Sequence, residues 1–229
     1  MPTYDRALPR PLALHRQRLG VVPTLTAAAL LVWGFQAPRP VATILLAYVL
    51  CDWWMWSLHA LLDHPAALDN RLFAERAAVF QNHHRYPCNI AHENHMISID
   101  DLCTISGVAA VVAVPSPSLA LAVGAHIVFG AVACANHYYC HTRSMGFEVP
   151  PAFVIAQDAG VLPSAKHHGL HHKRPHLVNW GFLVGFGALY DRLHNATGHS
   201  YAGAVTSASL SSPLAVVVVW RLGEFTGAW

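Results

Sequence analysis

The fold class is decided by residues 41–63, which read VATILLAYVLCDWWMWSLHALLD. The first 22 of these positions form an apolar run with one charge, Asp52, and a helix of that length spans about 33 Å. That is enough to cross the hydrocarbon core of a bilayer, and the tryptophans near its end suit a membrane interface. We therefore expect a transmembrane helix with His59 and Asp63 at its interfacial end.

Three further apolar runs lie at residues 19–35, 102–114 (extendable back to 97) and 119–139. Proline-rich turns separate the first run from the second and the third from the fourth. The pattern predicts an all-α, multi-pass membrane protein with four transmembrane helices in two hairpins and a His-rich helical cap. Because Lys and Arg gather in the N-terminal tail, in loop 63–101 and after residue 141, the positive-inside rule puts these parts in the cytoplasm.

The chain then divides into a cytoplasmic tail (1–18), a membrane domain (19–192) and a C-terminal tail of unassigned role (193–229). Within the central loop, residues 66–80 have the pattern of an amphipathic helix. Residues 177–190 are apolar and glycine-rich, and we expect them at the membrane interface or re-entering it. Residues 214–220 are too short to span.

Composition supports a membrane protein, because hydrophobic residues make up 54% and charged residues only 11%. A net charge of +2 without a basic run argues against a nucleic-acid partner. The five cysteines show no CxxC spacing, so neither a disulfide framework nor a zinc knuckle is indicated. Abundant alanine and scarce lysine hint at a bacterial source, and we expect the inner membrane, with the site facing the cytoplasm.

Histidine is the unusual feature, with 17 residues, of which 13 fall in or near four clusters on the predicted cytoplasmic side. The clusters are His59 and His64; His83, His84, His92 and His95; His137 and His141; and His167, His168, His171, His172 and His176. His15, His126, His194 and His199 lie outside them, and we interpret these four as ordinary polar or surface residues.

The spacing within the clusters indicates metal binding. His137 and His141 are four residues apart, so both rings can face one ion from the same side of a helix. In KHHGLHH (166–172) two such pairs, 167/171 and 168/172, lie about 100° apart around the helix axis and can serve two metals. Ten or more imidazoles exceed the four ligands of a tetrahedral zinc and suit two ions of higher coordination, of iron, copper, nickel or zinc.

Other catalytic motifs are missing from the sequence. It has no HExxH, GxSxG, P-loop or GxGxxG, and it lacks the paired Glu-x-x-His of soluble di-iron bundles. A redox metal centre in this chain must therefore receive its electrons from an external donor.

Five ordered segments carry a family resemblance: HALLD (59–63), FQNHHRYP (80–87), HYYCH (137–141), AQDAGVLPSAKHHGLHH (156–172) and KRPH (173–176). They resemble the lipid desaturase family, which includes the Kua proteins, CarF-like proteins, plasmanylethanolamine desaturases and the plant phosphatidylglycerol fatty acid desaturase. The resemblance covers about residues 20–192. It implies a four-helix membrane oxidoreductase with a di-iron centre (two Fe ions), O₂ as co-substrate and an external electron donor, cytochrome b5-like or ferredoxin-like.

The matched motifs imply that the metal ligands are His59, Asp63, His83, His84, His137, His141, His167, His168, His171 and His172. Further candidates, as ligands or as supports behind them, are His64, His92, Glu93, His95, Asp158 and His176. Where the family has another histidine after its HH pair, this chain has Glu93, flanked by two histidines. For the lipid we expect contacts from Trp53, Trp54, Trp56, Arg85, Lys173 and Arg174. No catalytic residue separate from the metal ligands is expected.

Our first hypothesis for the activity is formation of the plasmalogen vinyl ether from plasmanyl (1-O-alkyl) phospholipids of the membrane. An acyl-lipid (fatty acid) desaturase or hydroxylase with the same site is the nearest alternative. A His-rich metal transporter and a zinc-dependent membrane hydrolase are more distant ones, and metal content separates them from a desaturase.

Overall fold

The structure is a computed structural model that describes residues 21–87, 116–173, 176, 178–183 and 185–227. These residues form helices and no strand, which confirms the all-α prediction for the described part of the chain. In chain order the helices are α2 (Val21–Gly34), α3 (Pro40–Asp63), the 3₁₀ helix η2 (Pro65–Asp69), α4 (Ala74–Arg85), α7 (Pro117–Ser144), α8 (Pro151–Asp158), α9 (Ala165–His171), α10 (Gly187–Ala196), α11 (Tyr201–Ser211) and α12 (Pro213–Thr226).

Among the described residues, two helices are long and apolar enough to cross a membrane: α3 with 24 residues and α7 with 28. α2 has 14 residues and rises about 21 Å, which is short of a full span. The run predicted at residues 102–114 lies outside the described residues. Of the four expected spans, two are therefore matched by helices of membrane length among the described residues. The count of four and the two-hairpin arrangement stay predictions.

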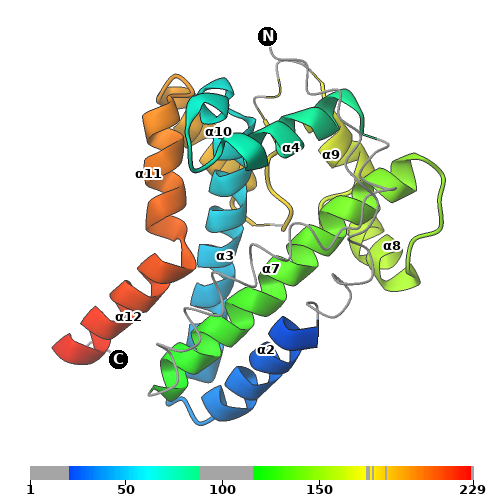
Figure 1. Cartoon of the computed structure of the whole chain (residues 1–229). Coiled ribbons are helices and arrows are strands. Elements are labelled where there is room, and N and C mark those ends of the chain that lie inside the picture. Colours follow the sequence, from blue (N-terminus) through cyan, green and yellow to red (C-terminus); the bar gives the residue numbers. More distant parts are fainter. Residues whose placement is uncertain (1–20, 88–115, 174–175, 177, 184, 228–229) are drawn as a thin grey trace.

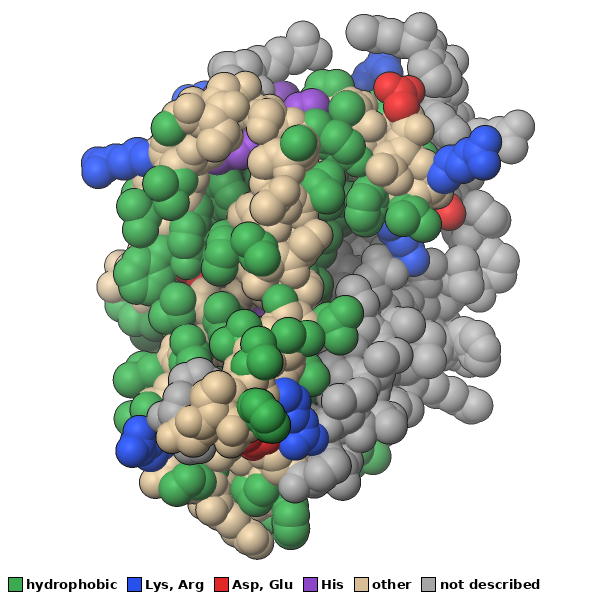
Figure 2. All heavy atoms as spheres, turned by 90° about the vertical axis from the view of Figure 1, so that its left-hand side faces the viewer, with side chains coloured by type: hydrophobic (Ala, Val, Ile, Leu, Met, Phe, Trp, Pro, Cys, Tyr) green, Lys and Arg blue, Asp and Glu red, His purple; other side chains and the backbone are tan. Residues whose placement is uncertain are grey.

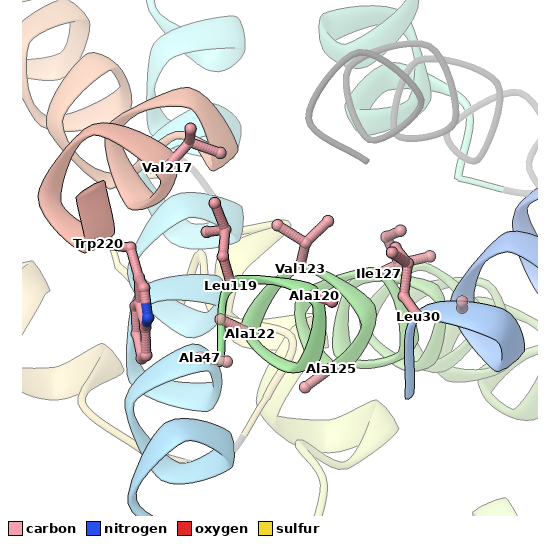
Figure 3. Packing of buried hydrophobic residues seen from close by; sticks show 11 residues of the cluster. Leu30, Ala47, Leu119, Ala120, Ala122, Val123, Ala125, Ile127, Val217 and Trp220 are labelled. Carbon is pink, nitrogen blue, oxygen red and sulfur yellow. The ribbon is translucent and has the colours of Figure 1, made fainter. Parts of the chain in front are cut away.

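The core of the bundle is built where α7 packs against α2 and α3 (Figure 1). Small residues allow a close approach: a Cβ on Gly34 would lie 2.6 Å from the Cα of Leu121, and one on Gly124 would lie 3.1 Å from the Cβ of Leu30. Figure 3 shows α7 side chains such as Leu119 and Val123 meeting residues of α2, α3 and α12. This packing fixes the direction of α7, and with it the position of the histidines at its C-terminal end.

The prediction of an amphipathic helix at 66–80 is wrong in its bounds, because the helical conformation is interrupted at Asn70. The Asn70 side chain accepts a hydrogen bond from the Leu72 N–H (2.9 Å), a local turn that competes with a continuous helix. A short η2 therefore precedes the break, and α4 starts at Ala74 and continues to Arg85. Pro87 is two residues further along the chain and disfavours a helical conformation at Tyr86, the residue after α4. As a result His83 and His84 lie in the last turn of a helix instead of in a loop.

The apolar segment predicted at 177–190 enters the helix bundle. Trp180, Phe182 and Leu183 are almost fully buried, and α10 follows at Gly187. The Phe186 N–H donates to the Asp52 carboxylate (3.0 Å), so this acidic residue in the middle of α3 holds the start of α10. Where this segment lies relative to the bilayer stays a prediction.

The predicted C-terminal tail forms part of the same bundle in the described residues. α11 packs along α3, and α12 contacts α7, so that α3 lies between α11 and α7 (Figure 1). Val217 and Trp220 of α12 are buried in the core cluster around α7 (Figure 3). α12 has 14 residues, in agreement with the expectation that this region is too short to span.

Candidate metal centre

The C-terminal ends of α3, α4 and α7 meet at the short helix α9, and their histidines face one another. α4 and α9 lie across the ends of the two long helices (Figure 1). His59 and Asp63 come from the end of α3, His83 and His84 from α4, and His137 and His141 from α7. His168 and His171 lie on α9, and His172 follows it directly. The side chains form two adjacent groups, each with its potential ligand atoms within 4.8 Å of one another.

The first group, the five-histidine cluster, consists of His83, His137, His141, His168 and His172. Its Nε2 atoms approach closely: the separation is 3.2 Å from His137 to His141, 2.9 Å from His141 to His168 and 3.0 Å from His168 to His172. The Nε2 of His83 is buried and has no hydrogen-bond partner among the described residues. Four of the five side chains are buried, so the cluster is largely shielded from water.

The second group, the carboxylate cluster, consists of Asp63 with His59, His84 and His171. The Asp63 carboxylate lies 2.9 Å from the Nε2 of His84 and 3.2 Å from that of His171. The Nε2 of His59 is also 3.2 Å from this carboxylate. Because Asp63 is an anion at the centre of three imidazoles, this cluster brings a formal negative charge that the five-histidine cluster lacks.

Both clusters have the donor set of a metal site. Backbone carbonyls face the Nδ1 atoms of three ligands: Trp180 O lies 3.0 Å from His59 Nδ1, Val178 O lies 2.9 Å from His171 Nδ1, and Phe80 O contacts His83 Nδ1. An Nδ1–H that donates to a carbonyl leaves the lone pair on Nε2, the atom that faces the cluster centre. Several lone pairs converging on one point are stabilised by a cation and repel one another without it.

The electrostatic environment keeps the imidazoles of His83, His168 and His172 neutral. Burial, with the neighbouring rings, holds the pKa of His83 and His168 well below the ordinary histidine value and lowers the pKa of His172 to about 2. Since only a neutral imidazole can donate a lone pair to a metal, the site is prepared for metal binding at neutral pH.

A comparison with known protein families agrees with this geometry. The model of the lipid desaturase domain matches residues 48–195, a stretch that holds all nine residues of the two clusters. The chain belongs to the lipid desaturase family. No curated protein and no solved structure matches it significantly.

Membership confirms the resemblance derived from the histidine motifs and makes the chain a desaturase, an oxidoreductase that acts on a lipid. The matched stretch begins in α3 and ends in α10, so that α11 and α12 lie outside it. The family is associated with membranes, in agreement with the two long apolar helices.

One predicted ligand of this desaturase, His167, is not brought to either cluster. Its side chain is exposed and lines a separate cavity of about 350 Å³ beside Ser164 and Asn179. Helix α9 thus presents His168 and His172 to one cluster and His171 to the other. The spacing in the sequence made the pairs 167/171 and 168/172 equivalent. The orientation of α9 about its own axis, set by its packing on α7, decides which of these rings face the clusters.

The further candidates lie around the clusters or outside the described residues. Both ring nitrogens of His64 contact groups outside the clusters: Nε2 lies 3.1 Å from His199 O, and Nδ1 accepts a hydrogen bond from the Ala66 N–H at 3.1 Å. His176 lies behind the ligands, with its Nδ1 2.9 Å from His171 O and its ring 4.6 Å from that of His84. Asp158 forms an exposed ion pair with Arg143 (2.8 Å). His92, Glu93 and His95 lie outside the described residues.

Two features of the site were missed in the sequence. The ring of Phe182 stacks on His59 and on His137, at centroid distances of 4.7 and 4.3 Å, and so contacts both clusters. The Gln157 side chain donates to Asn136 Oδ1 (2.9 Å), and Asn136 donates to the carbonyls of Pro163 and Phe182. Gln157 precedes Asp158 in a matched motif, which was a usable signal, whereas nothing in the sequence marked Phe182.

The predicted lipid contacts separate into three groups. Trp53 and Trp56 line a cavity between α3, α10 and α11. Trp54 packs instead into the core between α3 and α7, with its ring 5.5 Å from that of His126. His126 is buried, and neither of its ring nitrogens has a hydrogen-bond partner among the described residues, so it is neither the satisfied polar residue nor the surface residue that we expected. Arg85 and Lys173 are exposed, and Arg174 lies outside the described residues.

Proposed function

We propose that this desaturase holds two iron ions, one in each cluster, and uses O₂ to introduce a double bond into the chain of a membrane phospholipid. The preferred substrate in this proposal is a plasmanyl (1-O-alkyl) phospholipid, and the product is the vinyl ether of a plasmalogen. The observation that carries the proposal is the pair of adjacent ligand sets, one of five imidazoles and one of three imidazoles with a carboxylate.

The ligand sets favour iron over zinc. Structural zinc sites are closed by four ligands, and catalytic ones keep three protein ligands and one open position. Five imidazoles in one cluster exceed both numbers, and two neighbouring sites suit a metal pair. When bound, iron supplies the strong oxidant that an unactivated C–H bond requires, which acid–base side chains cannot supply.

The protein residues have three tasks in this proposal. The Nε2 atoms of the histidines and the Asp63 carboxylate hold the metals, and backbone carbonyls fix the ring orientation of His59, His83 and His171. The Phe182 ring closes one side of both clusters against water. Overall, the lipid gives two electrons and two protons and the external donor two electrons, so that O₂ with two further protons becomes two waters.

The position of the site defines how lipid and donor reach it. The clusters lie at the C-terminal ends of both long apolar helices, and therefore at one membrane boundary. We propose that this boundary faces the cytoplasm of a bacterial inner membrane, where a cytochrome b5-like or ferredoxin-like donor docks. Residues 19–192 then form the catalytic unit, with α11 and α12 supporting α3 and α7.

The decisive experiment is lipid analysis of a host that expresses the chain and is fed an alkyl-ether lipid. We expect a new acid-labile vinyl ether by mass spectrometry, and two Fe per chain in the purified protein. A new unsaturated acyl chain would instead assign the acyl-lipid alternative. One Zn per chain without an unsaturated product would contradict the proposal in favour of a hydrolase.

A further inference from the structure

An apolar groove of about 480 Å³ lies between α3, α10 and α11, and none of its lining residues belongs to either metal cluster. Its volume is within the range of small-molecule and lipid pockets. The lining residues are Val49, Trp53 and Trp56 of α3; Phe186, Leu189, Tyr190, Leu193, His194 and Thr197 on or beside α10; and Gly203 and Ser207 of α11.

The groove follows the membrane-spanning helix α3. Val49 and Trp56 are seven residues apart, so the groove extends about 10 Å along the helix axis. Phe186 lies at the deeper end, where its N–H bonds Asp52, and His194 lies beside Trp56, one turn before His59. The Ser207 hydroxyl in the wall is already engaged, by the Trp53 indole at 2.8 Å and by Ser57 at 2.6 Å.

Buried polar atoms without a hydrogen-bond partner among the described residues adjoin both ends of the groove: Asp52 Oδ1 near Phe186, and several groups at the upper end, next to the metal centre. The His194 ring lies 5.3 Å from the Trp180 ring and 5.0 Å from the His199 ring. Trp180 Nε1, His199 Nδ1 and the Tyr201 hydroxyl are buried and have no hydrogen-bond partner among the described residues. A buried donor without a partner is costly, and Trp180 is only 2% exposed. The unpaired donors, Trp180 Nε1 and the Tyr201 hydroxyl, thus lie at the end where α3 reaches the metal centre, whereas the unpaired atom near the deeper end, Asp52 Oδ1, is an acceptor.

The upper end also lies close to the carboxylate cluster. The Trp56 ring, which lines the groove, contacts the Trp180 ring edge-on at 5.4 Å. The Trp180 ring is 6.0 Å from that of His171, and its carbonyl faces His59. Trp180 thus stands between the groove and two of the metal ligands, with its indole near His171 and its carbonyl facing His59.

We propose that this groove binds the hydrocarbon chain of a phospholipid, with the polar glycerol end at His194 and the methyl end toward Val49. The proposal rests on the lipid substrate of the proposed function and adds the place where the chain lies. An apolar cleft along a membrane helix with unpaired donors at one end matches an amphiphile. Leu189 and Leu193 on its rim are at least half exposed, and Figure 2 shows hydrophobic side chains over the middle of this side of the molecule.

Photo-crosslinking of the purified full chain in lipid nanodiscs tests the proposal. The probe is an alkyl phospholipid with a diazirine in the middle of the chain, used on metal-free protein so that turnover is not required. We expect labelled peptides from α3, α10 and α11, and loss of the label when unlabelled phospholipid competes. Labelling confined to other helices, or competition by an isoprenoid quinone and not by phospholipid, would overturn the proposal.

Two variants that fill the groove sharpen the test. Val49→Trp occupies the deep end, and Leu189→Trp narrows the rim at a half-exposed position that does not threaten folding. We expect each to weaken binding of a long-chain probe about tenfold, the equivalent of roughly two methylene groups left unburied. A probe shorter by a few carbons should still bind Val49→Trp. The matched control is Val218→Trp on α12, which is exposed and outside the groove, and it should bind both probes normally.

The outcomes separate this proposal from the proposed function. Labelling of the groove without any unsaturated product would support the proposal that the groove binds lipid and would contradict the proposed desaturation. An unsaturated product together with unchanged probe binding in both groove variants would support the proposed desaturation and would contradict lipid binding in the groove.

Discussion

The two clusters differ in what holds their ligands. In the five-histidine cluster, α7 and α9 each offer a pair of rings four residues apart, and His83 completes the set. Helix geometry alone keeps such pairs on one face. In the carboxylate cluster, α3 supplies His59 and Asp63, and α4 and α9 supply one ligand each. Here an irregular segment also orients two of the rings, because the carbonyls of Val178 and Trp180 face the Nδ1 atoms of His171 and His59. Both clusters therefore depend on helix packing, and the second depends on a loop as well.

The loop has its own anchor. Asn179, between the two carbonyls, has a left-handed backbone (φ 61°) and donates its N–H to Asp191 Oδ2 at 2.8 Å. Asp191 Oδ1 in turn accepts the Trp56 indole N–H at 2.7 Å, which ties the loop to α3. Because Asp191 touches no ligand and acts through the loop, it is a positioning residue for the carboxylate cluster.

The largest effect is expected from removing a ligand that is central to one cluster. His168→Ala takes away the ring that contacts both His141 and His172, so activity should be lost and the metal content should fall from two ions toward one. Metal analysis and a lipid assay measure both results. The matched control is His167→Ala, one residue earlier and exposed, which should keep both metals. Equal losses of metal in the two variants would contradict the assignment of His168 to a cluster and of His167 to neither.

The second prediction tests the loop. Asp191→Asn and Asn179→Val should weaken metal binding at the carboxylate cluster by about 10- to 100-fold, because the carbonyls would no longer orient the rings. The ion of the five-histidine cluster should remain, a selectivity that a general loss of folding would not give. Asn179→Gly serves as the control, since glycine adopts a positive φ without strain. Metal titration of the three variants measures the difference.

A third prediction concerns the metal-free protein and pH. The pKa of His83, His168 and His172 is lowered on folding, to about 2 for His172, so the unfolded chain takes up protons first as the pH falls. Stability should therefore be retained above about pH 6.5, the unfolded histidine value, and fall progressively below it. Thermal unfolding between neutral pH and pH 5 measures this slope. His172→Gln should make it shallower, and an unchanged slope would show that this ring does not contribute.

The smallest effects are expected in the scaffold that both clusters share. Gln157→Leu leaves the buried Asn136 oxygen without its donor, and we expect a loss of about 1–3 kcal/mol in the free energy of unfolding. The neighbouring Asp158→Asn removes only an exposed ion pair with Arg143 and should cost less than about 1 kcal/mol. Chemical denaturation compares the two. A larger loss for Asp158→Asn would show that the exposed pair, and not the buried amide, holds α8 to α7.

The residue patterns gave the long helices and the ligand types, because both depend on local properties. An apolar run of sufficient length predicts α3 and α7, and spacing of four residues predicts that 137 and 141, or 168 and 172, share a face. The break at Asn70 was missed because the apolar pattern of 66–80 continues through a side-chain turn that periodicity does not detect.

By itself, the sequence predicted four spans, of which α3 and α7 are helices of membrane length among the described residues, and it placed enough imidazoles at their ends for two metals. Only the tertiary structure decided that His83 and His84 serve different clusters, that His171 and His172 do the same, and that His167 faces outward. It alone also placed Phe182 and Trp180 against the ligands and Asp191 behind them. The physical reason is that spacing fixes which side chains share a helix face, whereas the direction of that face is set by packing between helices distant in the chain.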